Sequence, residues 1–493
     1  MGNRVVIIGA GLGGLQCGYI LAKNGMQVTV LEHDVRIGGC LQSYKRGDVL
    51  FDAGFHYVGG LDEGQSLHGL FKYFNLLDLP WCRMDDNCFD EVVIGDRSFP
   101  FAAGHERFRE RLTEMFPHEK EGLRRYVAFL NEVGNHLPDS FLPHEASGFY
   151  SDSLFARSAY DWLCDIIHDP LLRKVLSGTS LKMELNRETL PLYVFAQINN
   201  SFIQSAWRIE GGGQQIAEHL AADIRRMGGE VRTNSTVTSI VEQDGKALGV
   251  RVNKQEFIPA DWIVSNQHPQ MLLRLLADSK NVRKVYKHRI TALGNTFGMF
   301  TANIHLKPGS MEYVNRNVYV HDENADLWKV DCDKVESVLV SFYKNQSALD
   351  LLTPMRWRQV AQWAAEPVGH RGQSYVDFKN RVTEDCLQLV EQRFPDLRGA
   401  IDRIYTSTPL TYNHYTLSWH GSAYGIRKDW QSPYTTVLTP KTPVSNVLMT
   451  GQNLNLHGVL GVSMTSVFTC AQIVGMETLT EQMEVSHWGK SED

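Results

Sequence analysis

A glycine-rich segment near the N-terminus has the composition and spacing of a dinucleotide-binding turn. Residues 9–14 read Gly-Ala-Gly-Leu-Gly-Gly and lie between an apolar run and a helical pattern. In such a G-x-G-x-x-G motif the first glycine makes the turn, the second lets the backbone approach a pyrophosphate, and the last lets the helix pack closely on the strand. The N-terminus of the helix then offers free N–H groups and a positive dipole to the phosphates. The motif predicts cofactor contacts at Gly9, Gly11, Leu12, Gly13 and Gly14.

A carboxylate and a second pair of glycines follow the motif and indicate which dinucleotide binds. Glu32 ends the next predicted strand, where a carboxylate accepts hydrogen bonds from ribose hydroxyls. Arg36 and the pair Gly38-Gly39 then allow a second backbone approach to a long dinucleotide, with a basic side chain that reaches its phosphates. NAD-dependent dehydrogenases do not need this second approach, so the expected cofactor is FAD. The predicted contacts in this part of the chain are Glu32, His33, Arg36, Gly38, Gly39 and Cys40.

A separate nicotinamide domain is not expected, because the sequence contains no second G-x-G-x-x-G motif. Gly211-Gly212-Gly213 precedes a predicted helix but follows no clear strand. The sequence therefore predicts a tightly held flavin and no second dinucleotide.

The strands and helix that must position the motif lie at the two ends of the chain. Residues 5–8 and 28–31 read as strands around a helix that runs from about Gly13 to a stop at Asn24-Gly25. Strand character returns at Val447, followed by a glycine-bounded turn and a last helix that extends to about Thr480.

A middle stretch of the chain resembles the N-terminal region in its pattern. A helix follows residues 211–213, and strands at 237–241 and 248–252 flank a hairpin turn at Asp244-Gly245. Residues 260–266 read as a further buried strand. Between these α/β stretches the patterns differ: residues 100–200 are helical and aromatic, and residues 280–430 mix longer strands and helices.

The predicted fold is therefore α/β, with a discontinuous Rossmann-type FAD-binding domain and a mixed α+β substrate domain formed by two insertions. The FAD-binding domain takes residues 1–98, 206–278 and 436–493. The substrate domain takes residues 99–205, which are helical, and residues 279–435.

Composition narrows the class of protein and its location. A net charge of −7 and the lack of a lysine or arginine run argue against a nucleic-acid binder. The eight cysteines have no metal-ligand spacing, so we expect free thiols in a reducing compartment and no metal site.

The first predicted strand begins almost at Met1, and no apolar run is long enough to span a bilayer. A cytoplasmic location is expected, with contact to a membrane surface left open.

Four motifs together resemble the flavin-dependent phytoene desaturase, carotenoid isomerase and retinol saturase superfamily, and its retinol saturase branch above all. The opening residues 5–40 resemble the start of that superfamily. Residues 51–59, FDAGFHYVG, resemble the F-D-x-G-x-H-Y-x-G of the branch. Residues 408–425, with TPLT, Tyr415 and GSAYG, resemble its T-P-L-T…Y…G-x-x-Y-G. The resemblance covers essentially the whole chain, although Asn453 stands where an aspartate is usual in the terminal T-G-Q-D motif.

The resemblance implies a reaction at a C=C bond of an apolar polyene or isoprenoid. Saturating such a bond needs a hydride on one carbon, which flavin N5 would supply, and a proton on its neighbour. His56 is the candidate proton donor. Tyr57, Tyr415 and Tyr424 are alternative donors, and His420 and His457 are weaker ones. The electron donor stays open between NAD(P)H and a reduced carrier protein.

The resemblance also extends the predicted cofactor site. Asp52 and Gly54 are expected near the flavin ring, where Gly54 permits close approach, and Asn266 is expected to shape the cavity. The helix that begins about Val462 is expected to point its N-terminus at the ring and to stabilise the reduced anion. The further predicted contacts are Asp52, Gly54, Thr236, Val237, Asn266, Gly451, Gln452, Asn453, Gly461 and Val462.

Three alternatives to a polyene reductase stay open at this point. The chain could run the reverse reaction as a carotenoid desaturase, or a redox-neutral isomerisation. It could be a flavin amine oxidase of the same fold. It could also bind flavin without catalysis, in a structural or partner-binding role.

Overall fold

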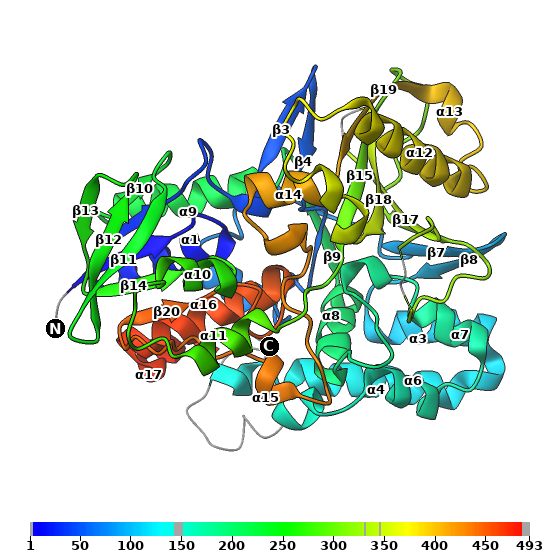
Figure 1. Cartoon of the computed structure of the whole chain (residues 1–493). Helices are drawn as coiled ribbons and strands as arrows, with labels where there is room; N and C mark the ends of the chain where they lie inside the picture. Colours follow the sequence, from blue (N-terminus) through cyan, green and yellow to red (C-terminus); the bar gives the residue numbers. More distant parts are fainter. Residues whose placement is uncertain (1–2, 142–150, 330–331, 345–346, 486–493) are drawn as a thin grey trace.

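A computed structural model describes residues 3–141, 151–329, 332–344 and 347–485 of the chain (Figure 1). Within them, five parallel strands form the sheet that carries the glycine motif. Their order across the sheet is β10 (Glu230–Arg232), β2 (Gln27–Leu31), β1 (Arg4–Ile8), β14 (Trp262–Ser265) and β20 (Val447–Met449). These strands come from three distant stretches of sequence, as predicted.

Helices cover this parallel sheet, whose strands are apolar and largely buried as parallel strands usually are. The helix α1 (Leu12–Lys23) ends at Asn24-Gly25 as predicted, and it packs against α9 (Gln214–Arg226) and α16 (Gly458–Val474). A small antiparallel sheet lies beside them, made of β11 (Val237–Gln243), β12 (Lys246–Val252) and β13 (Glu256–Pro259). Its first hairpin turns at Asp244-Gly245, where both residues have positive φ, as predicted.

A second, seven-stranded sheet forms the other half of the described structure. Its order is β19 (Ile401–Ser407), β15 (Gly298–Leu306), β18 (Ala348–Met355), β17 (Ser337–Phe342), β16 (Asn317–His321), β7 (Asp90–Ile94) and β8 (Arg97–Phe101). Neighbouring strands are antiparallel except β16 and β7, which are parallel. The strand β7 lies in the predicted first FAD-binding segment but belongs to this sheet, because it pairs with β16 far along the chain.

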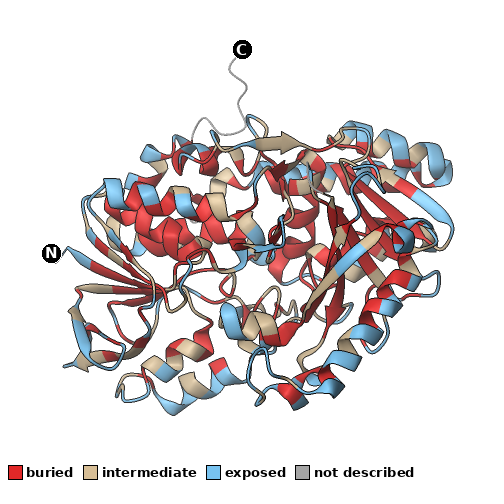
Figure 2. Cartoon of the chain, turned by 90° about the horizontal axis from the view of Figure 1, so that it is seen from above, coloured by how far each residue is buried: buried red, intermediate tan, exposed pale blue. Residues whose placement is uncertain are grey.

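Most helices of the insertions lie around the second sheet. The first insertion is helical as predicted, with α3 (His105–Met115), α4 (Lys120–Asn135), α6 (Ala159–Ile166), α7 (Pro170–Leu176) and α8 (Leu192–Gln204). The second FAD-binding segment ends with α10 (Pro269–Leu275). The second insertion contributes α11 (Lys284–Thr291), α12 (Gln373–Val390), α13 (Leu397–Ala400), α14 (Pro409–Tyr415) and α15 (Pro433–Thr436). Figure 2 shows buried residues concentrated in the parallel sheet with its helices and again in the seven-stranded sheet.

The remaining strands and helices belong neither to the two large sheets nor to the two insertions. They are β3 (Ser43–Arg46), β4 (Val49–Asp52), β5 (Val58–Gly59), α2 (His68–Tyr73), β6 (Trp81–Arg83), β9 (Ala206–Ile209) and α17 (Met476–Gln482). The strand β9 directly precedes Gly211-Gly212-Gly213, so the expectation that no strand precedes these glycines is wrong. The strand has four residues, AWRI, and so short a run is not recognised as a strand from the pattern alone.

The last helical region also differs from its prediction. The helix α16 begins at Gly458, one turn before the predicted start at Val462. It ends at Val474, and Gly475 has a φ of 89°, so the chain bends there before α17. Because a left-handed φ is open to glycine and strained for other residues, Gly475 separates one predicted helix into two.

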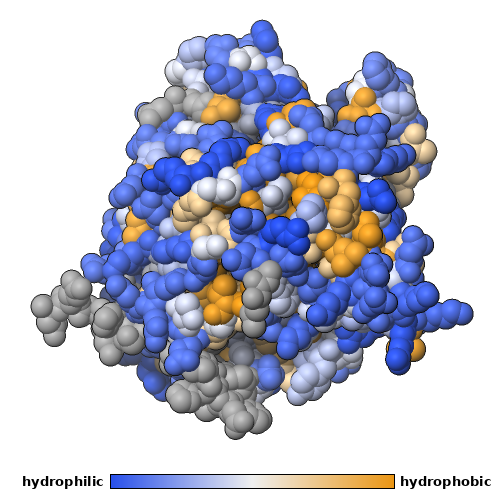
Figure 3. Space-filling model, turned by 90° about the vertical axis from the view of Figure 1, so that its left-hand side faces the viewer, coloured by the Kyte–Doolittle hydropathy of each residue, from blue (hydrophilic) through white to orange (hydrophobic). Residues whose placement is uncertain are grey.

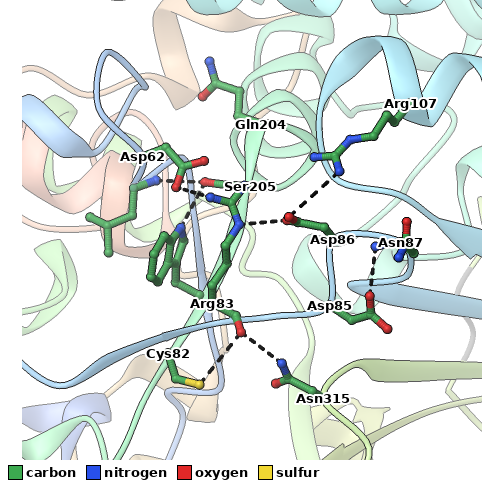
Figure 4. A network of polar contacts seen from close by, with 12 residues as sticks. Asp62, Cys82, Arg83, Asp85, Asp86, Asn87, Arg107, Gln204, Ser205 and Asn315 are labelled. Carbon is green, nitrogen blue, oxygen red and sulfur yellow. Dashed lines mark hydrogen bonds and ion pairs between the residues drawn. The ribbon is translucent and has the colours of Figure 1, made fainter.

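A polar network centred on β6 joins segments from both halves (Figure 4). The Arg83 guanidinium donates to Asp62 at 2.7 Å and to Asp86 at 2.8 Å, and it lies 5.5 Å over the Trp207 ring. Asn315 Nδ2 donates to the Arg83 carbonyl oxygen at 2.9 Å. Arg83 therefore fixes the chain where it passes from the parallel sheet toward β7.

The surface of the parallel-sheet half is mostly polar. Figure 3 shows apolar side chains gathered in the middle of this face, with polar side chains around them. Among the described residues, no helix is both long enough and apolar enough to cross a membrane.

Candidate functional site

One large cavity extends from the glycine motif to the seven-stranded sheet. Many of the predicted site residues line it, drawn from all three parts of the parallel-sheet domain and from the second insertion. These are Gly9, Gly11, Leu12, Gly13, Glu32, His33, Gly38, Gly39, Cys40, Gly54, His56, Asn266, Tyr415, Tyr424, Gly451, Gln452, Asn453 and Val462. Gly9 and Gly451 are more than 400 residues apart in the sequence, yet both line this cavity. The prediction that the C-terminal segment completes the cofactor site requires this arrangement.

Next to the glycine motif, the cavity wall consists mainly of glycine backbone that surrounds the side-chain amide of Asn266. We call this part of the wall the glycine cradle. Gly9, Gly11, Gly13 and Gly451 surround Asn266, which follows β14. A Cβ at Gly11 would lie 2.9 Å from Asn266 Nδ2, and one at Gly13 would lie 2.7 Å from Asn266 Oδ1. Any side chain at Gly11 or Gly13 would therefore displace Asn266 and fill the glycine cradle. The glycines keep the backbone open toward the cavity.

Gly14 has a packing role. A Cβ on this residue would overlap the carbonyl oxygen of Gly9, so α1 approaches β1 at a distance that glycine alone permits. The helix has no side-chain cap at its N-terminal residue, Gly11. The N–H groups of its first turn are consequently left to a ligand in the cavity.

Glu32 closes the end of β2 next to this turn and is buried. One carboxylate oxygen accepts from the Ala10 N–H at 2.8 Å, and the other accepts from the Asp34 N–H at 3.0 Å. His33 Nδ1 lies 2.7 Å from the second oxygen, and this hydrogen bond raises the pKa of His33. A carboxylate offers about four lone-pair positions, so Glu32 retains capacity for a ribose hydroxyl.

The cavity residues fit FAD. Besides the cradle and the free helix N-terminus, two lining side chains have polar atoms without a partner among the described residues: Ser422 Oγ and Gln267 Oε1. Ser422 is 4% exposed, and a buried hydroxyl without a partner is costly. A polar ligand in the cavity would satisfy both atoms. Gly9, Gly11, Gly38, Gly39 and Glu32 would hold the dinucleotide half, and Gly451 to Asn453 would approach it from the other side.

Seven predicted site residues do not line the cavity: Gly14, Arg36, Asp52, Tyr57, Thr236, Val237 and Gly461. Arg36 is exposed and donates to the Ser43 carbonyl oxygen at 3.3 Å. Gly461 lets α16 pack against Leu456, where a Cβ would overlap backbone atoms. Thr236 is exposed and Val237 is buried at the start of β11, so both belong to the small antiparallel sheet.

Asp52 lies behind the cavity wall, where it holds a turn. Its Oδ1 accepts from Ser43 Oγ at 2.6 Å and from the Gly213 N–H at 2.9 Å. Burial raises the pKa of Asp52 to about 6, although both hydrogen bonds act to lower it. The contact positions the glycine turn that leads into α9, so the expectation that Asp52 contacts the flavin is not supported.

Tyr57 is engaged elsewhere and does not face the cavity. Its hydroxyl lies 2.6 Å from the Tyr319 hydroxyl and donates to Asp90 Oδ2 at 3.0 Å. Lys182 Nζ donates to the same Asp90 oxygen at 2.7 Å, in an ion pair that is almost fully buried. Tyr57 therefore belongs to a buried polar cluster with Tyr319, Asp90 and Lys182, and it does not line the cavity.

His56 does line the cavity and is backed by a buried carboxyl group. His56 Nδ1 lies 3.9 Å from Asp350 Oδ2, on β18. Asp350 accepts from Tyr343 OH and from Asn303 Nδ2, each at 2.6 Å, and is fully buried. Burial raises the pKa of Asp350 to about 7 and lowers that of His56 to about 4. Near neutral pH the His56 imidazole is therefore neutral, and Asp350 is protonated in a substantial fraction of the molecules.

The seven-stranded sheet supplies an apolar end to the cavity. Leu181, Met299, Leu339 and Leu352 line it there, and Met299, Leu339 and Leu352 lie on β15, β17 and β18. Among the described lining residues Glu32 is the one carboxylate, and it lies at the dinucleotide end. The end near β15, β17 and β18 is therefore suited to an uncharged, apolar ligand.

Three tyrosines stand around this end. Tyr415 is 42% exposed on α14. Tyr424 donates to the Leu181 carbonyl oxygen, and its ring lies 4.4 Å from that of His457. Tyr412, which also lines the cavity, donates to the Ala53 carbonyl oxygen at 2.8 Å.

Sequence reasoning assigned no role to Asp350, Tyr412 or His268, although Tyr412 and His268 line the cavity. A single aspartate inside the apolar run ALDLLTPM was the available signal for Asp350. His420 and His457 do not line the cavity, and His457 Nε2 lies 3.0 Å from the Lys182 carbonyl oxygen.

The parallel sheet, the glycine cradle and the cavity together define a Rossmann-type flavoprotein. Residues 12–278 match the family model described as flavin-containing amine oxidoreductase. The chain belongs to this family.

Comparisons with individual proteins agree with that class. All-trans-retinol 13,14-reductase of Rattus norvegicus is 26% identical, over 97% of this chain and 86% of the relative. Prolycopene isomerase 2 of an Oncidium hybrid cultivar is 25% identical, over 57% of this chain and 52% of that protein. Among solved structures, a fatty acid isomerase from P. acnes aligns with a TM-score of 0.62 and 14% identity, covering 97% of this chain and 98% of that chain.

These findings confirm the α/β FAD-binding fold, the cofactor and the resemblance to the retinol saturase branch. The protein is an FAD-dependent oxidoreductase. The domain boundaries and the roles of individual site residues stay predictions.

Proposed function

We propose that this protein reduces a C=C bond of an apolar polyene or isoprenoid. The observation that carries the proposal is the position of His56, which lines the same cavity as the glycine cradle and has the buried Asp350 behind it. When bound, FAD supplies the hydride for one alkene carbon. The residues of this chain must then supply a proton to the neighbouring carbon and keep water away. The retinol reductases among the relatives support this reaction class.

The proton store in this mechanism is Asp350. His56 is neutral near pH 7 because its pKa is about 4, so it has no excess proton of its own to give. Its neutral ring can donate from one nitrogen while the other receives a proton from the Asp350 carboxyl group. Tyr343 and Asn303 hold that carboxyl group in place. Each turnover leaves Asp350 ionised until solvent returns a proton.

The apolar end of the cavity selects the substrate. Leucine and methionine side chains on the seven-stranded sheet can pack along a hydrocarbon chain and exclude water from the reacting carbons. A protonated amine bound at the apolar end of the cavity would have no lining carboxylate to pair with its positive charge. The lining therefore favours a polyene over an amine. The carotenoid isomerase among the relatives supports the same substrate class.

Two further parts of the proposal concern the surroundings of the enzyme. The electrons come from outside the protein, from NAD(P)H or from a reduced carrier. The enzyme works in the cytoplasm, and it collects its apolar substrate at a membrane surface.

The test is anaerobic reoxidation of the reduced holoprotein. The flavin is reduced, and retinoids, carotenoids and unsaturated lipids are added in turn while the oxidised flavin band is followed. Return of that band together with a saturated product supports the proposal. The control adds putrescine and other amines to the oxidised protein. Flavin reduction by an amine, with no polyene turning over, would overturn the proposal in favour of amine oxidation.

A further inference from the structure

A buried cation lies behind the part of the cavity wall that the C-terminal region supplies. Lys428 is 8% exposed. Its Nζ donates to the carbonyl oxygens of Thr436 at 2.9 Å, Asn453 at 2.7 Å and Leu454 at 2.9 Å. An ammonium group has three N–H donors, so these contacts use all of them. Every acceptor is a neutral backbone oxygen.

The charge of Lys428 has no counter-ion among the described residues. The buried Lys182 forms an ion pair with Asp90, whereas Lys428 forms none. Burial of an unpaired ammonium is unfavourable and lowers the pKa of Lys428 to about 7. A nearby anion would offset this cost and keep the side chain protonated.

The positive charge of Lys428 acts on two buried histidines, one of which lines the cavity. Burial is the main cause of the low pKa of His268, about 4, and the positive charge of Lys428 adds to it. The same two causes act in the same direction on His457. His268 lines the cavity, so the positive charge is felt at the wall where an anionic ligand would lie.

Lys428 also secures the backbone of the cavity-lining segment. Gly451, Gln452 and Asn453 line the cavity, and two of the carbonyl groups bound by Lys428 belong to Asn453 and Leu454. The Asn453 side chain adds a second link, since its Oδ1 accepts from the Ile426 N–H at 3.2 Å. The chain at 426–428 therefore holds the segment 451–454 at the cavity.

We propose that Lys428 is an electrostatic positioning residue for the flavin cofactor. It holds the 451–454 segment against the cavity, and its uncompensated positive charge stabilises the negative charge that the diphosphate and the reduced ring bring there. Removing the charge weakens FAD binding and disfavours the reduced cofactor. This inference depends on FAD as cofactor and is independent of the substrate.

The test compares three purified variants with the wild type. Lys428→Met removes the charge and the donors, Lys428→Gln removes the charge and keeps N–H donors, and Lys441→Met removes an exposed lysine before β20 as a control. The measurements are the FAD dissociation constant, the midpoint potential of the bound flavin and the thermal unfolding temperature. We expect both Lys428 variants to bind FAD about tenfold or more weakly and to have a lower midpoint potential, with the control unchanged.

The midpoint potential separates the electrostatic role from packing. A Lys428→Gln protein with the wild-type potential and affinity would overturn the proposal. If neither neutral variant retains FAD, Lys428→Arg decides, because it keeps the charge. FAD binding at the wild-type potential in that variant supports the proposal, and failure to bind FAD would reduce Lys428 to a packing residue.

Discussion

His56 and Asp350 form a pair across the two halves of the molecule, with His56 Nδ1 3.9 Å from Asp350 Oδ2. His56 follows the short hairpin β3–β4, whereas Asp350 lies in the middle of β18. The histidine faces the cavity and the carboxyl group is fully buried behind it. Their pKa values are displaced in opposite directions from the ordinary ones. In the proposed mechanism, such a pair divides the work between His56, which contacts the substrate, and Asp350, which stores the proton.

Asp350→Asn should slow turnover about 100-fold while FAD stays bound. The amide keeps the shape of the side chain and its contact with Tyr343, but it cannot release a proton. Single-turnover reoxidation of the reduced flavin by a polyene measures the effect. Asp333→Asn, at an exposed carboxylate, is the control. An unchanged single-turnover rate in Asp350→Asn would exclude Asp350 as the proton store.

The rate should fall as the pH rises through about 7. The active form of Asp350 is the protonated one, and its raised pKa of about 7 keeps that form populated below this pH. Single-turnover rates measured across the pH range should therefore be high on the acid side and decline on the alkaline side. This decline should be missing in Asp350→Asn. A wild-type rate that is independent of pH near 7 contradicts the assignment.

His56→Ala should abolish most turnover, by about 100-fold or more, without loss of FAD. The imidazole is the group that faces the cavity, and the glycine cradle that holds the dinucleotide does not depend on it. Retained flavin absorbance checks the cofactor, and product formation checks the reaction. His305→Ala, at a partly exposed histidine on β15, serves as the control. Full activity in His56→Ala would show that the proton comes from another group, with Tyr412 and Tyr424 next in line.

Gly14→Ala should cost FAD binding more than tenfold and destabilise the fold. The added methyl group overlaps the Gly9 carbonyl oxygen, so α1 has to move away from β1 and its N-terminus leaves the cavity. Gly399→Ala is the matched control, since a Cβ there meets no other atom within 4 Å. FAD titration and thermal unfolding report the two effects. Wild-type affinity in Gly14→Ala would mean that the helix position does not matter.

Lys182→Met should destabilise the protein by about 3 kcal/mol or more, because it leaves Asp90 buried without a counter-ion. Lys72→Met, which breaks the exposed pair with Glu484, should change the free energy of unfolding by less than about 1 kcal/mol. Denaturant unfolding of the two variants measures the difference. Equal effects would show that the cluster around Tyr57 contributes no more than a surface ion pair.

Most of the residues predicted for the dinucleotide half of the site do line one cavity, because few arrangements fit their types and spacing. Gly9, Gly11 and Glu32 have a chemical reason for each position, and the distances between them along the chain are short. The three-part origin of the parallel sheet was also predictable, since its apolar strands recur after each insertion.

The substrate half was harder to predict because its contacts are not local. Asp350 reaches His56 only once β18 has paired with β15 and β17, and no periodicity reveals that pairing. Tyr57 was a candidate because it follows His56 in a motif, yet its hydroxyl bonds to Asp90 and lies against Tyr319, contacts that depend on distant strands. Lys428 gave no signal, because a lone lysine in a loop is usually solvated.

The arrangement of the parallel sheet has a consequence for how the protein is made. The central strand β1 pairs with β2 soon after it in the chain, but its other edge pairs with β14, and β14 in turn pairs with β20. The ribosome makes the chain from the N-terminus. One edge of β1 therefore stays unpaired until β14 has been made, and β14 stays unpaired on its other edge until β20 has been made. We therefore expect cofactor capture to follow the pairing of β20, and we expect the flavin-free protein to be more exposed to aggregation and proteolysis than the holoprotein.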